Sequence, residues 1–179
     1  MSGIDQALAR NRVFATKGGH RGATIMPALA LYVITCLDPR LDPSAILGLE
    51  LGDAAIVRNA GGRVTDEVIA DVAFIGQLAE RAVPEGPLFE VVVIHHDQCG
   101  TGALADDAFR AVYATRTATD PDTLRDRAVL DPEATVRADV TRLRAATAVP
   151  ARVAISGHVY RVETGLVQTI VSAPDLSDP

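Results

Sequence analysis

The 179-residue sequence has no apolar stretch that approaches the roughly eighteen residues needed to cross a bilayer. It begins without the basic and then apolar layout of a secretory signal, so we expect a cytoplasmic protein. Lys and Arg number 17 against 23 Asp and Glu, for a net charge of -6, and they form no dense basic stripe. Because nucleic-acid binding depends on clustered positive charge, we expect a small-molecule substrate and neither a nucleic acid nor a membrane as partner.

Cysteine is equally scarce, since only Cys36 and Cys99 are present. In a reducing compartment two cysteines are inert core residues, a redox pair or metal ligands, and a structural disulfide is the least expected. Burial in the core is a fair interpretation of either one alone, because free Cys is among the most buried residue types. The neighbouring residues must therefore decide between these roles.

Apolar runs alternate with helical periodicities along the chain. Runs typical of strands lie at residues 29–36, 54–57, 88–94 and 152–156, with a terminal hairpin at 159–162 and 166–171. Helical spacing of apolar residues is found within 4–14, 68–82 and 132–147. This alternation predicts an α/β fold with a mainly parallel central sheet of four to five strands flanked by helices.

The length and the 48% of apolar residues indicate a single domain spanning residues 1–179. We expect residues 1–20 to form an N-terminal helical arm and residues 172–179 to form a loose tail. The charges of residues 114–130 fit either a solvated loop or a short helix.

Two short strings at the ends of apolar runs are the most informative part of the chain: Cys36-Leu37-Asp38-Pro39-Arg40 and His96-Asp97-Gln98-Cys99-Gly100. They supply two thiolates and one imidazole. This ligand set fills three of the four coordination positions of zinc and leaves one open, as in catalytic sites. If the chain stays extended past Cys36, the side chains of the first string that are two residues apart project together. The carboxyl ends of parallel strands are where open α/β sheets bind ligands, so both strings are predicted to lie at one site. Alternation points His95 to the opposite face.

This combination resembles the β-class carbonic anhydrases, whose pattern is Cys-x-Asp-x-Arg followed much later by His-x-x-Cys. The resemblance covers roughly residues 30–104 and extends to Gly52-Asp53 and Arg58-Asn59-Ala60-Gly61. The short chain and the His95-His96 pair are most similar to the small bacterial branch of that family.

The resemblance implies one zinc ion per chain, bound by Cys36, His96 and Cys99, with water or the carboxylate of Asp38 in the fourth position. Arg40 would pair with Asp38 and hold it off the metal, which makes these two the catalytic candidates. The candidates for binding substrate or an anion are Arg58, Asn59 and Gly100. Arg58 can equally be a structural salt-bridge residue, and Asn59 can shape the turn that follows it. The family also implies a homodimer or homotetramer in which the N-terminal helix packs on the neighbour.

The implied reaction is the reversible hydration of carbon dioxide to bicarbonate by a zinc-bound hydroxide, because zinc lowers the pKa of bound water from about 15.7 to about 7. The alternative is a carbonyl sulfide hydrolase, which would release hydrogen sulfide and carbon dioxide on the same zinc site. Departures from the family pattern at Pro39, His95, Asp97-Gln98 and Thr101 remove no ligand. They bear on substrate and rate, since these residues line or support the pocket.

Two other hypotheses stay open. The string from Gly100 to Ala105 imitates a dinucleotide-binding fingerprint, but Asp120, the acidic residue at the right distance, is expected in a loop and not at the end of a strand. Alternatively, Asp38 closes the fourth position permanently and the zinc is structural.

Overall fold

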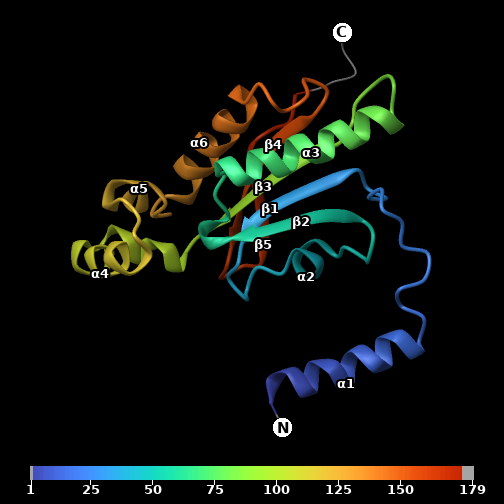
Figure 1. Cartoon of the computed structure of the whole chain (residues 1–179), viewed down its shortest axis with the longest axis horizontal. Helices are drawn as coiled ribbons and strands as arrows, with labels where there is room; N and C mark the ends of the chain where they lie inside the picture. Colours follow the sequence, from blue (N-terminus) through green and yellow to red (C-terminus); the bar gives the residue numbers. More distant parts are fainter. Residues whose placement is uncertain (1, 175–179) are drawn as a thin grey trace.

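The computed structural model describes residues 2–174, which build one five-stranded sheet in the order β2-β1-β3-β4-β5 (Figure 1). The strands are β1 (Leu31–Cys36), β2 (Ala54–Asn59), β3 (Glu90–His96), β4 (Ala154–Arg161) and β5 (Leu166–Val171). The first four strands pair in parallel, and β5 runs antiparallel to β4. The predicted α/β fold with a mainly parallel sheet is confirmed.

The described residues also form six α-helices and two 3-10 helices. The α-helices are α1 (Gly3–Thr16), α2 (Pro43–Leu47), α3 (Asp66–Ala82), α4 (Asp107–Thr117), α5 (Pro121–Asp126) and α6 (Pro132–Ala145). The 3-10 helices are η1 (Ala60–Gly62) and η2 (Gly100–Ala105). None of these helices combines the length and the hydropathy that crossing a membrane requires.

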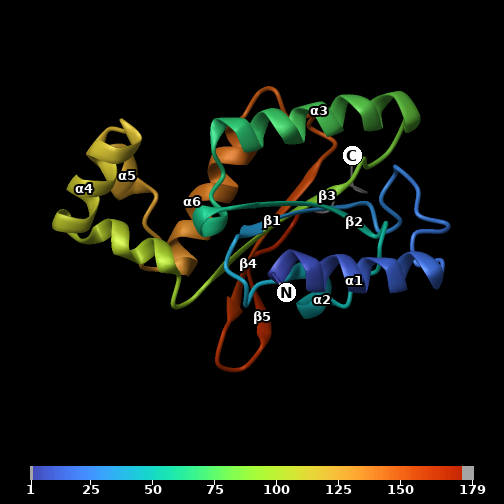
Figure 2. The same cartoon turned by 60° about the horizontal axis from the view of Figure 1, so that its bottom comes forward.

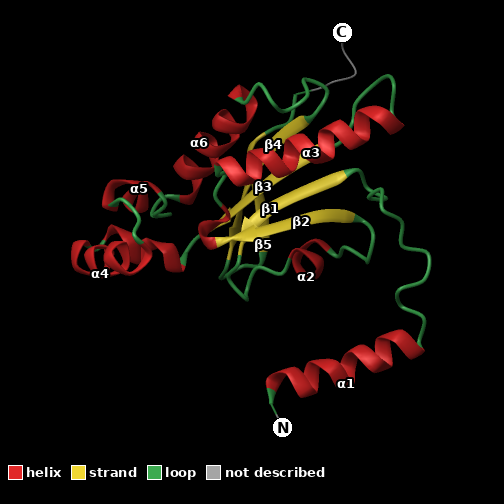
Figure 3. Ribbon diagram, in the orientation of Figure 1, coloured by secondary structure: helices red, strands yellow, loops and turns green. Residues whose placement is uncertain are grey.

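The two faces of the sheet are covered unequally (Figures 2 and 3). Helices α3 and α6 pack on one face and form the main core with it, in which Val72, Val93 and Val140 are almost completely buried. The opposite face carries a smaller core that includes Val33 and Leu41 and is bordered by α2. Helix α1 has no buried residue and stands apart from the sheet in Figure 1.

The local sequence explains where the main helices begin. The Thr65 hydroxyl accepts a hydrogen bond from the N–H of Val68, and acidic residues fill the first turn of α3, where the helix dipole favours them. Asp131 caps α6 in the same way, and Pro132 occupies the first helical position, where it loses no hydrogen bond. In β1, five of six residues are buried, as expected for a central strand covered on both faces.

The structure corrects the sequence analysis at the carboxyl end of the chain. The predicted fourth strand and the first arm of the predicted hairpin form one continuous strand, β4, while its hairpin with β5 is confirmed. Gly157 does not interrupt β4, because residues 154–160 pair with β3 without a break. A Cβ atom at Gly157 would be 2.8 Å from Cγ2 of Val140 in α6. Residues 114–130 are largely helical, in the end of α4 and in α5, and α2 was not predicted. The expected loose tail falls partly outside the described residues.

The strand order creates the crevice in which the sequence motifs lie. From β1 the chain passes to β2 on one side, and then crosses to β3 on the other side of β1. Open parallel sheets bind ligands outside the carboxyl ends of the strands at such a change of direction. Cys36 ends β1 and His96 ends β3, so both motifs begin at this point.

Candidate metal centre

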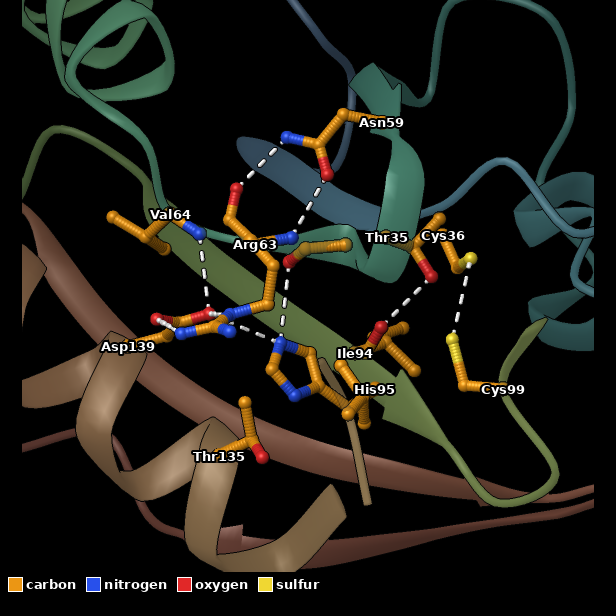
Figure 4. Close-up of polar contacts among 12 residues, drawn as sticks. Thr35, Cys36, Asn59, Arg63, Val64, Ile94, His95, Cys99, Thr135 and Asp139 are labelled. Atoms are coloured by element: carbon orange, nitrogen blue, oxygen red, sulfur yellow. Dashed lines mark hydrogen bonds and ion pairs between the residues drawn. The ribbon is translucent and has the colours of Figure 1, made fainter. Parts of the chain in front are cut away.

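Three donor side chains converge at the carboxyl ends of β1 and β3. The ligand atoms of Cys36, His96 and Cys99 all lie within 4.8 Å of one another. The two sulfur atoms are 4.0 Å apart, and Figure 4 shows the two cysteines facing each other. The structure thus brings together the three residues that the sequence analysis put at one site.

The turn between His96 and Cys99 is held in place by Arg40. Gln98 has a φ of 55°, in the left-handed region that few residues other than glycine adopt. Arg40 donates from Nη2 to the backbone oxygen of Gln98 at 3.1 Å and from Nη1 to its Oε1 at 3.3 Å. A residue of the first motif therefore stabilises the unusual backbone of the second.

Asp38 and Arg40 form a two-pronged ion pair beside the donors. Nε of Arg40 donates to Oδ1 of Asp38 at 3.0 Å, and Nη2 donates to Oδ2 at 2.8 Å. The expected extended chain past Cys36 is wrong, because β1 ends there and the N–H of Leu41 donates to the Asp38 oxygen to close a turn. The two side chains meet across this turn and not by strand alternation.

The donor set fits a metal ion of the zinc type. His96 is 0% exposed, yet neither of its ring nitrogens has a hydrogen-bond partner among the described residues. A buried polar atom without a partner is uncommon in proteins and needs an explanation. Two thiols and an imidazole within reach of one another provide one, since sulfur and nitrogen donors are the ligands that zinc prefers.

The protonation preferences of the site follow from its crowding. The hydrogen bond between the thiols lowers the pKa of Cys99 and raises that of Cys36. Burial opposes the protonation of His96, but its contacts with Cys99 and the negative charge of Asp38 outweigh burial and raise its pKa. The hydrogen bond from Arg40 lowers the pKa of Asp38 to about 2. Asp38 is therefore an ionised acceptor at neutral pH.

The other predicted site residues lie close by and mostly bind backbone atoms. Arg58 donates from Nε to the carbonyl oxygen of Cys36 at 3.0 Å and from Nη2 to that of Asp38 at 2.7 Å. The side-chain amide of Asn59 donates to the oxygen of Arg63 and accepts from its N–H, both at 2.8 Å. These contacts hold the loops on which the donors are mounted.

A largely apolar cavity of about 360 Å³ opens beside Cys36 and Asp38, and Gly100 and Thr101 line it on the side of the second motif. Its apolar lining consists of Leu37, Pro39, Ala60, Leu104, Phe109 and Tyr113. Phe109 and Tyr113 stack on each other with ring centroids 6.1 Å apart. The cavity can take a small, weakly polar molecule next to the donors and a carboxylate.

Similarity to known proteins identifies the family of this chain. The family model described as carbonic anhydrase matches residues 31–118. Beta-carbonic anhydrase 1 of Mycobacterium tuberculosis is 30% identical over 171 residues, which cover 95% of this chain and 99% of that protein. The chain belongs to the β-carbonic anhydrase family.

Relatives within the β-carbonic anhydrase family carry two kinds of name. The carbonic anhydrase of Streptococcus mutans matches the structure with a TM-score of 0.80 at 33% identity, covering 95% of this chain and 98% of that one. The carbon disulfide hydrolase of Acidianus sp. (strain A1-3) is 30% identical, over 75% of this chain and 74% of that protein. The family therefore includes both lyases and hydrolases. The Acidianus hydrolase is named for carbon disulfide, whereas the alternative substrate expected from the sequence is carbonyl sulfide.

The dinucleotide hypothesis loses its structural basis. Residues 100–105 form the 3-10 helix η2 beside the donors, and the α-helix begins only at Asp107. Asp120 caps α5 and accepts a hydrogen bond from the N–H of Thr123, so it lies at the start of a helix and not at the end of a described strand. The fingerprint needs an acidic residue at the end of a second strand.

Sequence reasoning missed residues on α4 and α6. Phe109 and Tyr113 form one wall of the cavity, and their spacing of four residues is the signal that could have predicted a shared helix face. Asp139 is 2% exposed on the apolar stripe of α6, and a carboxylate on such a stripe could also have been singled out.

Proposed function

We propose that the chain binds one zinc ion through Cys36, His96 and Cys99 and catalyses the reversible hydration of carbon dioxide to bicarbonate. The observation that carries this proposal is the convergence, next to an apolar cavity, of two thiols and a buried imidazole that has no hydrogen-bond partner among the described residues. A bound zinc ion would lower the pKa of a coordinated water from about 15.7 to about 7 and so supply a nucleophile near neutral pH.

In this proposal Asp38 orients the attacking water. Its Oδ2 lies 4.0 Å from Nε2 of His96, so the carboxylate is next to the donors. Because it is ionised, it accepts a hydrogen bond from the water and directs a lone pair toward the substrate carbon. Arg40 binds both carboxylate oxygens, which restrains Asp38 from becoming a fourth ligand and favours the catalytic over the purely structural zinc site.

The loop contacts support different roles for the remaining candidates. Arg58 binds two backbone oxygens, so we propose that it stabilises the first motif and binds no anion through these nitrogens. Asn59 supports the following turn in the same way. Gly100 lines the cavity, and we keep it as the candidate for substrate contact.

Carbonyl sulfide hydrolysis is the second candidate function. The same nucleophile can attack the carbon of carbon dioxide, carbonyl sulfide or carbon disulfide, which are all small and linear. The apolar lining of the cavity favours weakly hydrated sulfur compounds as much as carbon dioxide. The name of the Acidianus relative supports hydrolysis of a carbon–sulfur bond within the family.

We also propose a cytoplasmic homodimer or homotetramer. Helix α1 exposes Ile4, Leu8 and Phe14, and it has no buried residue within the described chain. An amphipathic helix without a surface to cover it is typical of an arm that packs on a second copy. Size-exclusion chromatography with light scattering on the full chain and on a variant without residues 1–20 tests this, and a monomeric full chain would contradict it.

Zinc content and activity should be measured together on the purified protein. We expect about one zinc per chain, and fast hydration of carbon dioxide that rises from mildly acidic to mildly alkaline pH. Parallel assays with carbonyl sulfide and carbon disulfide separate the two functions. Efficient release of sulfide with slow hydration would transfer the assignment to the hydrolase, and a protein that binds no zinc would exclude both.

A further inference from the structure

A buried carboxylate lies on the face of β3 opposite the zinc donors. Asp139 of α6 accepts hydrogen bonds from Nε of Arg63 to Oδ2 at 2.8 Å and from Nη2 to Oδ1 at 3.1 Å. The N–H of Val64 donates to Oδ2 at 3.1 Å, and Nε2 of His95 lies 3.2 Å from the same oxygen (Figure 4). We call these four residues the Asp139 cluster.

The Asp139 cluster is unusual for its position in the core. On α6, Asp139 is a neighbour of Val136, Val140 and Leu143, which are all 1% exposed or less. Replacing a buried ion pair by apolar side chains is often neutral or stabilising, so packing alone does not explain a carboxylate here. The four donors instead fix the place of the carboxylate relative to two separate segments of chain, residues 63–64 after η1 and His95 in β3.

The first of these segments, which follows the turn at Gly62, supports Cys36. Nε2 of His95 is also 3.2 Å from the carbonyl oxygen of Gly62, so two acceptors face this nitrogen and it carries the proton. Gly62 has a φ of 68° and lies against the end of β1, where a Cβ atom would be only 2.9 Å from the backbone nitrogen of Cys36. A shift of this turn would therefore displace the first thiol.

The second segment leads to His96. His95 and His96 are consecutive in β3 and point to opposite faces, and both are 0% exposed. A rotation or slide of His95 would move the backbone that carries the imidazole donor. One carboxylate is thus connected, through His95 and the Gly62 turn, to the supports of two of the three donors.

We propose that Asp139, together with Arg63 and His95, positions Cys36 and His96 and so sets the affinity of the site for zinc. None of the three touches the reacting atoms, so they are positioning residues. The inference rests on the proposed function, because it assumes that the donors bind zinc.

The test is the zinc dissociation constant of Asp139→Asn, measured by competition with a chromophoric chelator. Groups that support metal ligands typically change affinity 10- to 100-fold, and we expect a loss of about tenfold. The absorption bands of the cobalt-substituted protein should also change, because they report on coordination geometry. His95→Gln keeps a donor for the Gly62 oxygen and should recover part of the affinity that His95→Leu loses.

A matched control separates positioning from general destabilisation. Leu143→Ala removes a fully buried side chain from the same helix but none of the polar groups that bind the Asp139 carboxylate. It should lower the melting temperature while changing the zinc affinity by less than about threefold. Should Asp139→Asn fail to fold, Arg63→Gln carries the test, since the Arg63 side chain is 16% exposed and its loss is easier to accommodate.

The outcomes distinguish the two levels of the proposal. If Asp139→Asn has the same zinc affinity and cobalt spectrum as the unaltered protein, the positioning role is overturned and the proposed function still stands. Equal affinity losses in Asp139→Asn and Leu143→Ala would overturn it as well. An unaltered protein that binds no zinc would overturn the proposed function, and the positioning role with it.

Discussion

The two faces of the sheet at the end of β3 treat adjacent histidines in opposite ways. His96 faces two thiols and a cavity, and neither of its ring nitrogens has a partner in the described chain. His95 faces α6 and binds both Asp139 and the Gly62 oxygen through one nitrogen. Both side chains are fully buried, so burial alone does not distinguish them. The partners decide which histidine is available to a metal and which belongs to the scaffold.

Replacing each histidine by alanine, one at a time, should show the largest difference between the two faces of the sheet. His96→Ala removes a donor, and we expect zinc to be lost and carbon dioxide hydration to fall by more than about 100-fold, beyond the usual effect of a supporting group. His95→Ala should keep measurable zinc and activity but unfold at a lower temperature. Zinc analysis, hydration assays and thermal unfolding of both variants check this, and equal zinc content in the two would refute the distinction.

Asp38→Asn tests the metal-facing side without removing a donor. The amide cannot replace the ionised acceptor, so we expect zinc to stay near one per chain while turnover falls about 100-fold. The variant needs a zinc determination on the same sample that is assayed. Full turnover with full zinc would exclude the orienting role of Asp38.

Much of this arrangement could be predicted from the sequence, because local patterns determine it. Apolar runs located β1 to β3, and the spacing within the two motifs put Cys36, His96 and Cys99 at the ends of two strands. Alternation alone put His95 on the other face. The turn at Asp38 was missed. Arg40, which pairs with Asp38 across this turn, also binds Gln98, 58 residues later in the chain, and no local pattern reveals that contact. That the chain forms a single domain stays a prediction.

The contacts of Asp139 could not be predicted, because its partners are far away in the sequence. Arg63 precedes it by 76 residues, and the two meet only because α6 and η1 both pack against β3. The same holds for the merging of two predicted segments into β4. Pairing with β3 along residues 154–160 keeps that strand continuous, and no local pattern reveals this pairing.

The contacts of Asp139 should also affect how the free energy of unfolding depends on pH in the acid range. Burial raises the pKa of Asp139, but His95 and Arg63 outweigh burial and hold it below its ordinary value. A lowered pKa in the folded state stabilises the protein above the unfolded pKa of about 3.9, and this contribution is lost as pH falls through the folded value. Asp139→Asn should therefore cost about 2 kcal/mol at pH 7 and progressively less below about pH 4. Urea unfolding of both proteins across this range measures it, and a constant difference would contradict the assignment.

Gln98→Gly should have the smallest effect. Glycine relieves the left-handed backbone but adds freedom to the unfolded chain, so we expect the free energy of unfolding to change by less than about 1 kcal/mol. The backbone oxygen still accepts from Arg40, so the zinc content should not change. Loss of zinc in this variant would mean that the side-chain contact with Arg40 matters more than the backbone one.

The position of Asp139 in the chain has a consequence for biosynthesis. All three proposed zinc donors have been synthesised once residue 99 is added, but the carboxylate that joins Arg63 and His95 follows 40 positions later. On the ribosome, the thiols and the imidazole are therefore exposed to cellular metal before α6 can dock. Until α6 docks, His95 and Arg63 lack their carboxylate partner, so the two strings that carry the donors are not yet held as in the folded chain.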